Sequence, residues 1–366
     1  MRELAAIPVE TLRAASPAGS KDLAAFRRAL LRWYDKNLRD LPWRKTRDPY
    51  RIWLSEIMLQ QTRVAAVLGH YRIFLERFPN VHALAAASED DVLAAWSGLG
   101  YYRRARMLHQ AARQMAEQHG GCLPRNSGAL LALPGIGRYT AAAIASIAFD
   151  EAIAVVDGNV ERVLQRFIGP NLTTPQTWQQ AQALLAIARP GDFNQAMMEL
   201  GATVCVPRAP RCPVCPVRKW CGAQQSSQAA IRAITNPITM ERRASLPGKR
   251  PTPPSIRHVK KQLWCVLNQR DGGVRLVQRP RKASLMPGMW ELPQSSEPPR
   301  PLPASAHWRT FRHSITVTDY TVHVIRNTPL TDAVPAPNGK WVAIDRIPQI
   351  PITGLTRKIL KAGGII

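Results

Sequence analysis

The pattern of residue types changes near residue 222, and this change limits the possible folds more than any other feature. From Lys21 to about Gly222 the chain is rich in Ala and Leu, and stretches such as YYRRARMLHQAARQMAEQ repeat apolar residues every three or four positions. That spacing puts the apolar side chains on one face of a helix. After about Arg257, β-branched and aromatic residues alternate instead, as in FRHSITVTDYTVHVI. The sequence therefore predicts a multidomain protein, all-α first and β-rich afterwards.

The boundary between the two parts is predicted in a polar, basic and Pro-rich segment, residues 223–257, which suits an extended linker. Residues 1–20 are then an N-terminal tail, 21–222 a helical region and 258–366 a second domain. In that domain KKQLWCVLNQ and VRLVQ flank the turn Asp271-Gly272-Gly273, which predicts a β-hairpin. A chain of 366 residues is long enough for two such domains.

The chain is strongly basic, with 50 Lys and Arg residues against 25 Asp and Glu and a formal net charge of +25. Such a surface attracts polyanions through counterion release, so nucleic acid is the expected partner, although a merely basic protein is the alternative. No uninterrupted apolar segment approaches the ~20 residues that span a bilayer, and the first residues lack the apolar core of a signal peptide. We expect a cytoplasmic, nucleoid-associated monomer with no membrane partner.

Cysteine spacing predicts a metal site. The motif Cys205-x6-Cys212-x2-Cys215-x5-Cys221 lets four thiolates converge from one short loop. Disulfides are the alternative, but a cytosolic setting disfavours them. A four-thiolate site serves zinc and iron–sulfur clusters equally, so the spacing leaves both open. The remaining Cys122 and Cys265 are expected to be buried apolar residues.

Two carboxylates stand in unusual places. Glu56 lies within the apolar stretch WLSEIMLQQTRV, where burial would disfavour its charged form, unless the side chain faces solvent. Asp157, in AIAVVDGNVERVL, precedes a predicted helix and suits an N-cap, whose backbone N–H groups keep a carboxylate charged. One neutral and one charged carboxyl group together can protonate a leaving group and stabilise an oxocarbenium-like sugar.

A further motif, LPGIGRYTAAAIASIA, places Gly135 and Gly137 in a tight turn before an Ala-rich helix. Backbone N–H groups at such a helix start can bind a phosphate, as in helix-hairpin-helix elements. A packing corner is the alternative interpretation.

Together with LPWR, GLGYYRRARML and FNQAMMELGA, these motifs make the chain resemble the MutY family of adenine DNA glycosylases in the endonuclease III superfamily. The likeness is dense over residues 21–222 and looser beyond. It implies an all-α helix-hairpin-helix glycosylase fold, with a six-helix barrel at about 43–150. The resemblance also implies, next to the barrel, an iron–sulfur domain made of the N-terminal helix and about 157–222. The resemblance also implies that double-stranded DNA binds in the cleft between them and that the four cysteines hold a 4Fe-4S cluster.

The resemblance assigns catalytic roles. Glu56 would protonate N7 of a flipped-out adenine, and Asp157 would stabilise the cationic sugar. Tyr139 stands where bifunctional members carry a lysine, and a phenol cannot form a Schiff base. The chain is therefore expected to excise a base without cutting the strand, with Tyr139 positioning Asp157 and Asn159 assisting.

Other sites follow from the resemblance. The adenine pocket would use Trp43, Arg44 and Glu199. Gln61 and Thr62 would contact the purine opposite the adenine. Leu99 and Tyr101 would fill the gap that the flipped base leaves in the duplex. The DNA backbone would be met by Gly135, Gly137, Arg208 and Arg211.

In the second domain, SLMPGMWELPQ resembles the start of a Nudix box. Nudix hydrolases need clustered acids for divalent cations, but between Pro293 and Asp319 this chain has only Glu297. The resemblance implies a noncatalytic, Nudix-like α+β domain that recognises 8-oxoguanine. After Phe311-Arg312-His313 the family usually has Phe-Ser-His, whereas this chain has Ile315-Thr316-Val317. Only the Thr316 hydroxyl is kept, so the preference for 8-oxoguanine over guanine stays open.

The expected function is monofunctional removal, in base excision repair, of adenine mispaired with 8-oxoguanine or guanine. One alternative is an endonuclease III-like glycosylase and lyase for oxidised pyrimidines, against which Tyr139 and the second domain argue. The other is a noncatalytic helix-hairpin-helix DNA-binding protein, against which the pair Glu56 and Asp157 argues.

Overall fold

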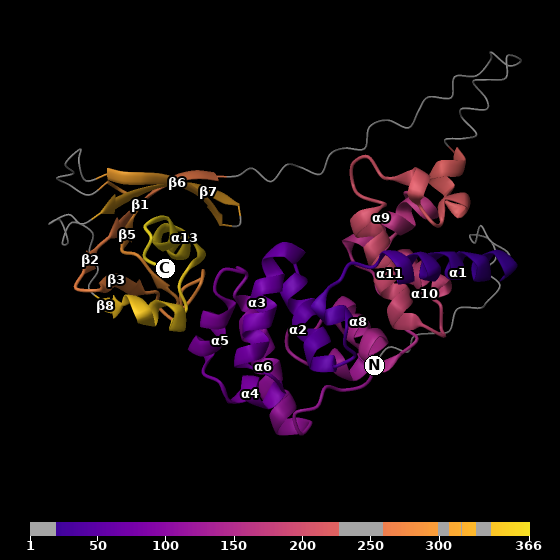
Figure 1. Cartoon of the computed structure of the whole chain (residues 1–366), viewed down its shortest axis with the longest axis horizontal. Helices are drawn as coiled ribbons and strands as arrows, with labels where there is room; N and C mark the ends of the chain where they lie inside the picture. The colour runs from indigo at the N-terminus through magenta and orange to yellow at the C-terminus, as the bar shows by residue number, and fades with distance from the viewer. Residues whose placement is uncertain (1–19, 227–258, 299–306, 316, 327–337) are drawn as a thin grey trace, which may run out of the picture. The chain divides into compact units, whose positions relative to one another are not determined.

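A computed structural model describes residues 20–226, 259–298, 307–315, 317–326 and 338–366 (Figure 1). The part of the chain before residue 227 is helical there, as the apolar spacing predicts. Its elements are α1 (Ser20–Asn37), η2 (Pro42–Arg44), α2 (Pro49–Leu59), α3 (Val64–Arg77), α4 (Val81–Ala86), α5 (Glu89–Trp96), α6 (Arg103–Gln118), α7 (Ser127–Leu130), α8 (Arg138–Phe149), α9 (Gly158–Phe167), α10 (Thr174–Leu184), α11 (Pro190–Thr203), η3 (Cys212–Val214) and η4 (Arg218–Trp220).

Local sequence signals fix where the helices that carry the site begin. Asp48 caps α2, since its side chain accepts hydrogen bonds from the backbone N–H groups of Tyr50 and Arg51, and Pro49 occupies the first helical turn. Gly137 precedes α8, and Gly135 just before it has φ of +75°, a left-handed conformation that favours glycine. The turn between α7 and α8 therefore has the glycine chemistry of the predicted helix-hairpin-helix element.

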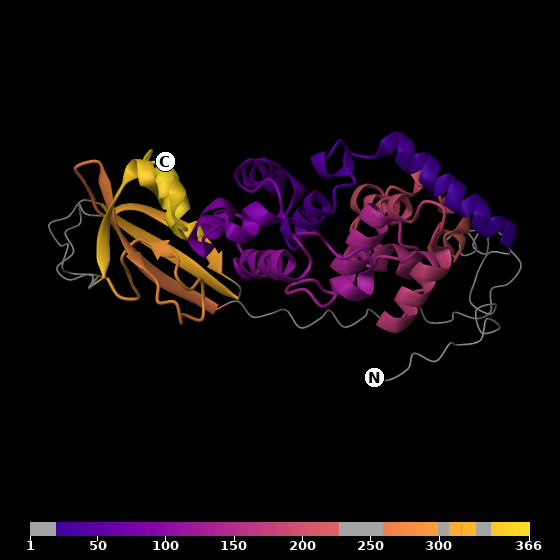
Figure 2. The same cartoon turned by 90° about the horizontal axis from the view of Figure 1, so that it is seen from below.

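A large helical core joins segments that are far apart in the sequence. Its buried residues come from α1, α9, α10 and α11, and include Phe26, Phe167 and Phe193, with Trp220 from η4. The ring of Phe26 lies 5.0 Å from that of Phe167 and 5.8 Å from that of Trp220, between centroids. Figure 2 shows α1 alongside the segment that contains α9, α10 and α11. This core holds the start of α9 next to α11.

The described residues after 258 form two four-stranded sheets and a helix. In one sheet the strand order is β5-β1-β7-β6, with β1 and β7 parallel and the other pairs antiparallel. In the other, β3 pairs with β2, β4 and β8. A single core packs residues of both sheets against α13 (Figure 1). The elements are β1 (Val259–Leu267), β2 (Gln269–Arg270), β3 (Gly273–Gln278), β4 (Trp290–Glu291), β5 (Gln294–Ser295), β6 (His307–Ile315), β7 (Thr318–Arg326), β8 (Gly339–Ala343), η6 (Ile344–Gln349) and α13 (Gly354–Ala362).

The predicted hairpin between residues 260–269 and 274–278 is correct only at its turn. The tight turn at Asp271 and Gly272 joins β2 to β3. Strand β1, however, belongs to the other sheet, where β5 and β7 use both of its edges. Because neither edge of β1 is left open to β3, the long strand and β3 diverge at the buried Asn268.

The described residues group into two compact units, one made of 20–60 with 114–226 and the other of 61–113 with those after 258. The predicted linker lies outside the described residues except at 223–226, so the predicted domain boundaries stay predictions. None of the described helices has both the length and the apolar character that crossing a bilayer would require.

Candidate active site

Glu56 is buried in the middle of α2, with 6% of its surface exposed. Trp53 and Met58 on the same helix are fully buried, so the carboxyl group lies in apolar surroundings. This burial raises the pKa of Glu56 to about 7. A hydrogen bond from Tyr139 and the positive charge of Arg44 act against the rise, while the charge of Asp157 adds to it. Near neutral pH, Glu56 can therefore hold a proton and release it.

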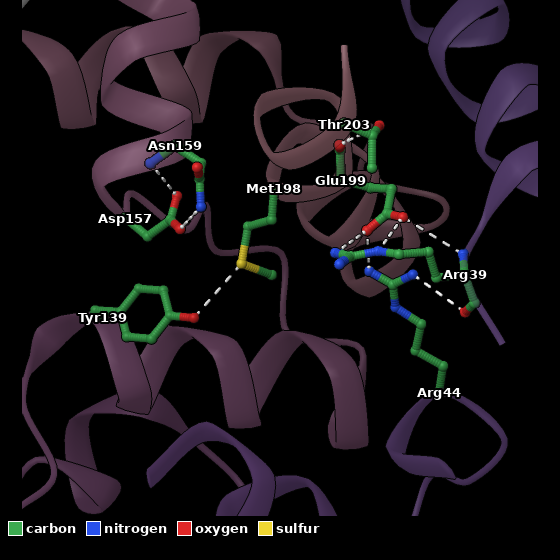
Figure 3. A network of polar contacts seen from close by, with 8 residues as sticks. All are labelled: Arg39, Arg44, Tyr139, Asp157, Asn159, Met198, Glu199 and Thr203. Atoms are coloured by element: carbon green, nitrogen blue, oxygen red, sulfur yellow. Dashed lines mark hydrogen bonds and ion pairs between the residues drawn. The ribbon is translucent and has the colours of Figure 1, made fainter. Parts of the chain in front are cut away.

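Tyr139 lies in the first turn of α8 and contacts Glu56. Its hydroxyl donates a hydrogen bond to Oε2 of Glu56 at 2.6 Å. The same hydroxyl lies 3.5 Å from Sδ of Met198, as Figure 3 shows. Burial, and then the negative charges of Glu56 and Asp157, raise the pKa of Tyr139 well above its usual range, so the phenol stays a donor. The sequence predicted that Tyr139 positions Asp157, whereas the described hydrogen bond is to Glu56. Packing of α8 on α2 is the reason for this difference.

Asp157 is the N-cap of α9, as the sequence predicts. Its Oδ1 accepts hydrogen bonds from the backbone N–H groups of Asn159 at 3.0 Å and Val160 at 2.7 Å. Its Oδ2 accepts one from the side-chain amide of Asn159 at 2.8 Å (Figure 3). The Asn159 amide is itself oriented by Arg162, whose Nη2 donates to Asn159 Oδ1 at 2.9 Å. The described hydrogen bonds of Asp157 all come from N–H donors, with its carboxyl oxygens as the acceptors.

Glu56, Tyr139 and Asp157 thus come together from α2, α8 and the start of α9. Their proximity is evident in their electrostatics, since the charge of Asp157 acts on both Glu56 and Tyr139. A proton donor with a pKa near neutrality and a carboxylate fixed by N–H groups make a pair with opposite roles. This arrangement can perform acid catalysis on a leaving group while an anion faces a developing cation.

Of the predicted pocket residues, Arg44 and Glu199 are bonded to each other. Glu199 on α11 is buried, and its Oε2 accepts from Nη2 of Arg44 at 2.6 Å. Burial acts to raise the pKa of Glu199, but hydrogen bonds from Arg39 and Arg44 outweigh it, so the pKa is lowered. Trp43, next to Arg44 in η2, is also buried. Arg39 was not predicted as a site residue, although it stands only two positions before the LPWR motif, in RDLPWR.

The predicted metal ligands lie around one cavity. It has a volume of about 170 Å³ and is lined by Cys205, Cys212, Cys215 and Cys221. Among the described residues, no three His, Cys, Asp or Glu side chains converge closely enough to hold a single metal ion. Four thiols around one cavity are the ligand set of a metal site, either zinc or an iron–sulfur cluster. Of the other two cysteines, Cys265 is buried, whereas Cys122 is exposed, contrary to the prediction.

Predicted DNA-facing residues of the other unit are joined by Arg104, which was not predicted from the sequence. Its Nη2 donates to Oγ1 of Thr62 at 3.0 Å and to the Leu99 carbonyl at 3.4 Å. Gln61 and Tyr101 both have positive φ, 55° and 48°. The Tyr101 side chain is 55% exposed, whereas Leu99 is buried. A positive φ at a non-glycine residue is strained and is often found at functional sites.

The remaining predicted positions lie elsewhere. Gly135 and Gly137 are in the turn before α8, and Arg208 and Arg211 are exposed in the loop between Cys205 and Cys212. Thr316 lies outside the described residues.

Comparisons with known proteins agree with this fold. Residues 54–187 match the model of the HhH-GPD superfamily of base excision DNA repair proteins. A thermostable thymine-DNA glycosylase structure is 33% identical, with a TM-score of 0.53, over 56% of this chain and 98% of that one. A non-covalent endonuclease III–DNA complex is 20% identical, with a TM-score of 0.50, over 58% and 99%, which shows the shared fold. The class is therefore an HhH-GPD helical DNA glycosylase, here with a C-terminal α/β region.

Curated relatives narrow this class. The adenine DNA glycosylase of Rattus norvegicus is 37% identical over 405 residues, covering 93% of this chain and 78% of its own. That of Homo sapiens is 38% identical over 408 residues, covering 93% and 74%. The chain belongs to the adenine DNA glycosylase family.

Proposed function

We propose that this glycosylase removes adenine mispaired with 8-oxoguanine or guanine, and that it is monofunctional. The observation that carries this proposal is the buried Glu56, with a pKa of about 7, next to Tyr139 and within the field of Asp157. A purine is a poor leaving group until it is protonated. A glutamic acid that is still protonated near neutral pH provides that proton.

In this mechanism the adenine is extruded first, because its glycosidic bond cannot be reached inside the base stack. Glu56 transfers its proton to N7 of adenine. The C1′–N9 bond then breaks, its electron pair leaves with the base, and positive charge develops on the sugar. The Asp157 carboxylate stabilises that charge until water adds to C1′ and the proton of the water returns to Glu56. The products are adenine and an abasic site.

Tyr139 supports the monofunctional assignment. A lyase step needs an amine that forms an imine with the sugar, and the phenol of Tyr139 cannot supply one. Its hydrogen bond to Glu56 gives it a different task, which is to hold the acid in place and to limit the rise of the Glu56 pKa. Asn159 fixes the Asp157 carboxylate in the same way.

We assign the remaining predicted residues to the DNA. Trp43, Arg44 and Glu199 would form the adenine pocket, and Gln61, Thr62, Leu99 and Tyr101 would contact the opposite base and fill the gap in the stack. The turn with Gly135 and Gly137, and the exposed Arg208 and Arg211, would contact phosphates.

The four cysteines would hold a 4Fe-4S cluster. Arg166 supports this site, since its Nη1 lies 3.2 Å from Sγ of Cys205 and also donates to the carbonyl of Val206 at 2.8 Å. Hydrogen bonds to cluster sulfurs tune reduction potential. When bound, the cluster would supply the crosslink that fixes the loop of Arg208 and Arg211.

The second domain, predicted at 258–366 after a linker at 223–257, would be Nudix-like and would recognise 8-oxoguanine. Support for a noncatalytic role comes from Glu291, the acid of the Trp-Glu-Leu-Pro element, which is bonded by Arg279 Nη1 at 2.8 and 2.9 Å. A carboxylate paired in this way is not free to bind a divalent cation. A monomer that acts on chromosomal DNA in the cytoplasm completes the proposal.

One assay tests the function. Duplexes that hold A opposite 8-oxoguanine, A opposite G, or thymine glycol opposite A are incubated with the protein and analysed before and after alkali. We expect adenine release with breaks only after alkali, and direct nicking or inert binding would contradict the proposal. Glu56→Gln and Asp157→Asn should bind the duplex with unchanged affinity and lose excision, and normal turnover in either would reject the role assigned to that residue.

A further inference from the structure

Arg39 is a charged residue that the proposed mechanism does not use. It lies between α1 and η2, and 41% of its side chain is exposed. Its guanidinium nevertheless makes a paired contact with Glu199, from Nε to Oε1 and from Nη2 to Oε2, both at 2.7 Å (Figure 3). Its backbone N–H also points to Oε1, at 3.4 Å. A paired contact of this kind fixes the plane of the carboxylate as well as its place.

Glu199 is thereby shared between two arginines. Its side chain is fully buried, and Oε2 accepts from Arg44 in addition to Arg39. A buried carboxylate that already accepts three charged N–H bonds is largely committed to its protein partners. Within the proposed adenine pocket, Glu199 is therefore also the anion that holds Arg44 in place.

Arg44 links this cluster to the acid. Its side chain is only 8% exposed, Nη1 donates to the Arg39 carbonyl at 3.3 Å, and the guanidinium carbon lies 5.6 Å from the centre of the Tyr34 ring. The charged and polar groups that act on Glu56 are Tyr139 from α8, Asp157 at the start of α9, and Arg44 from η2. Arg44 is the cation among them, so its position influences how easily Glu56 becomes an anion, although burial acts more strongly on that group.

We propose that Arg39 is a positioning residue. It acts through Glu199 to hold Arg44 at the place from which the positive charge of Arg44 favours the anionic form of Glu56. This inference rests on the proposed function, because it assumes that Glu56 is the acid. Without the Arg39 guanidinium, Oε1 of Glu199 keeps only the long backbone contact at 3.4 Å, and the carboxylate draws Arg44 onto itself. The Glu56 anion then has less support. Without the charge of Glu199, Arg44 is no longer held by an ion pair, and its positive charge stabilises the anionic form of Glu56 more strongly.

The two changes should therefore shift the pH profile in opposite directions. The single-turnover rate of adenine release needs protonated Glu56, so it falls as pH rises through the pKa of that residue. In Arg39→Met this fall should move to higher pH, by about half a pH unit or more. In Glu199→Gln it should move to lower pH. Arg39→Lys keeps the charge without the paired contact and should show a smaller shift in the direction of Arg39→Met.

Arg189→Met is the matched control. Arg189 is 43% exposed and makes the same type of paired contact, to Asp35 at 2.7 and 3.1 Å, next to the start of α11. Its charge is not among those that act on Glu56. The fall in rate should stay at the wild-type pH in this variant.

An unshifted fall in Arg39→Met, or shifts in the same direction for Arg39→Met and Glu199→Gln, would overturn the inference. So would an equal loss of rate at every pH, which is the result expected of a phosphate contact. If Arg39→Met does not fold, as judged by circular dichroism, Arg39→Lys decides by the same criterion. Glu56→Gln is assayed in parallel. If it still excises adenine, the proposed acid is wrong, whereas an inactive Glu56→Gln with an unshifted Arg39→Met rejects only the role of Arg39.

Discussion

At the scale of single residues, the sequence predicts the burial of Glu56 but not all of its contacts. Its burial and raised pKa follow from its apolar neighbours along one helix, because these neighbours are local in sequence. The hydrogen bond from Tyr139 does not follow, because the two residues are 83 positions apart and meet only through the packing of α8 on α2. The same holds for Arg39 and Glu199, which are 160 positions apart.

The buried acid should also make stability depend on pH. Glu56 has a pKa of about 7 in the folded state against an ordinary value of 4.5. Its protonated form is therefore favoured by folding, and this contribution is complete below pH 4.5 and is lost as pH rises to about 7. Glu56→Gln stays neutral, so its stability relative to wild type should grow across this window and level off above it, by on the order of 3 kcal/mol.

Urea unfolding of both proteins at a series of pH values measures this difference. Glu161→Gln is the control, since Glu161 is exposed on α9 and should give a flat difference. A flat difference for Glu56→Gln as well would mean that Glu56 is not held in a desolvated site.

At the scale of elements, the start of α9 was predictable from the sequence, whereas the packing of α11 against it was not. Asp157 before Gly158 and Asn159 is a local capping signal, and the structure caps α9 with it. What holds that cap in space is α11, where Gly201 packs directly against Asn159. A close approach of two helices depends on the tertiary fold, and the sequence around Gly201 contains no signal for it.

Gly201→Ala tests this contact. A Cβ at this position would lie 2.6 Å from Cβ of Asn159 and 3.0 Å from its carbonyl oxygen, so α9 and α11 must separate. We expect a loss of about 1–3 kcal/mol in the free energy of unfolding, as is usual for overpacking. We also expect slower excision, because Asn159 orients Asp157.

Gly69→Ala is the control, since a Cβ there meets nothing within 4 Å. An alanine there should leave excision unchanged and raise stability by up to about 1 kcal/mol. Unchanged stability and rate in Gly201→Ala would contradict this account of the packing.

At the scale of the whole molecule, the sequence predicts a helical part and a β-rich part but not how the strands pair. Alternation identifies β1 and β7 as strands, yet their parallel pairing, from Val259 with Thr318 to Leu267 with Arg326, joins segments that the chain separates widely. Pairing of this kind depends on burial across the whole domain. The nearby turn at Asp271 and Gly272 misleads, because it suggests that β1 pairs with the next strand.

The cysteine loop packs against the helical core that joins distant parts of the chain. Cys205, Cys215 and Cys221 pack against the core that joins α1, α9, α10 and α11, whereas Cys212 lies in η3 outside that contact within the described residues. Substitution of Cys212 therefore removes a proposed cluster ligand with little loss of packing. Because a structural metal site contributes to folding free energy, its loss should lower the stability of this whole core.

In Cys212→Ser we expect less iron and acid-labile sulfide per chain, a lower thermal unfolding midpoint, and weaker binding to DNA through the loop of Arg208 and Arg211. Cys122→Ser is the control, because Cys122 is exposed and lies far from the motif in sequence. It should match the wild type in all three measurements. One zinc ion per wild-type chain, with no sulfide, would reject the cluster. An unchanged midpoint in a Cys212→Ser protein that has lost its iron would show that the loop folds without it, and that the helical core alone positions α9 and α11.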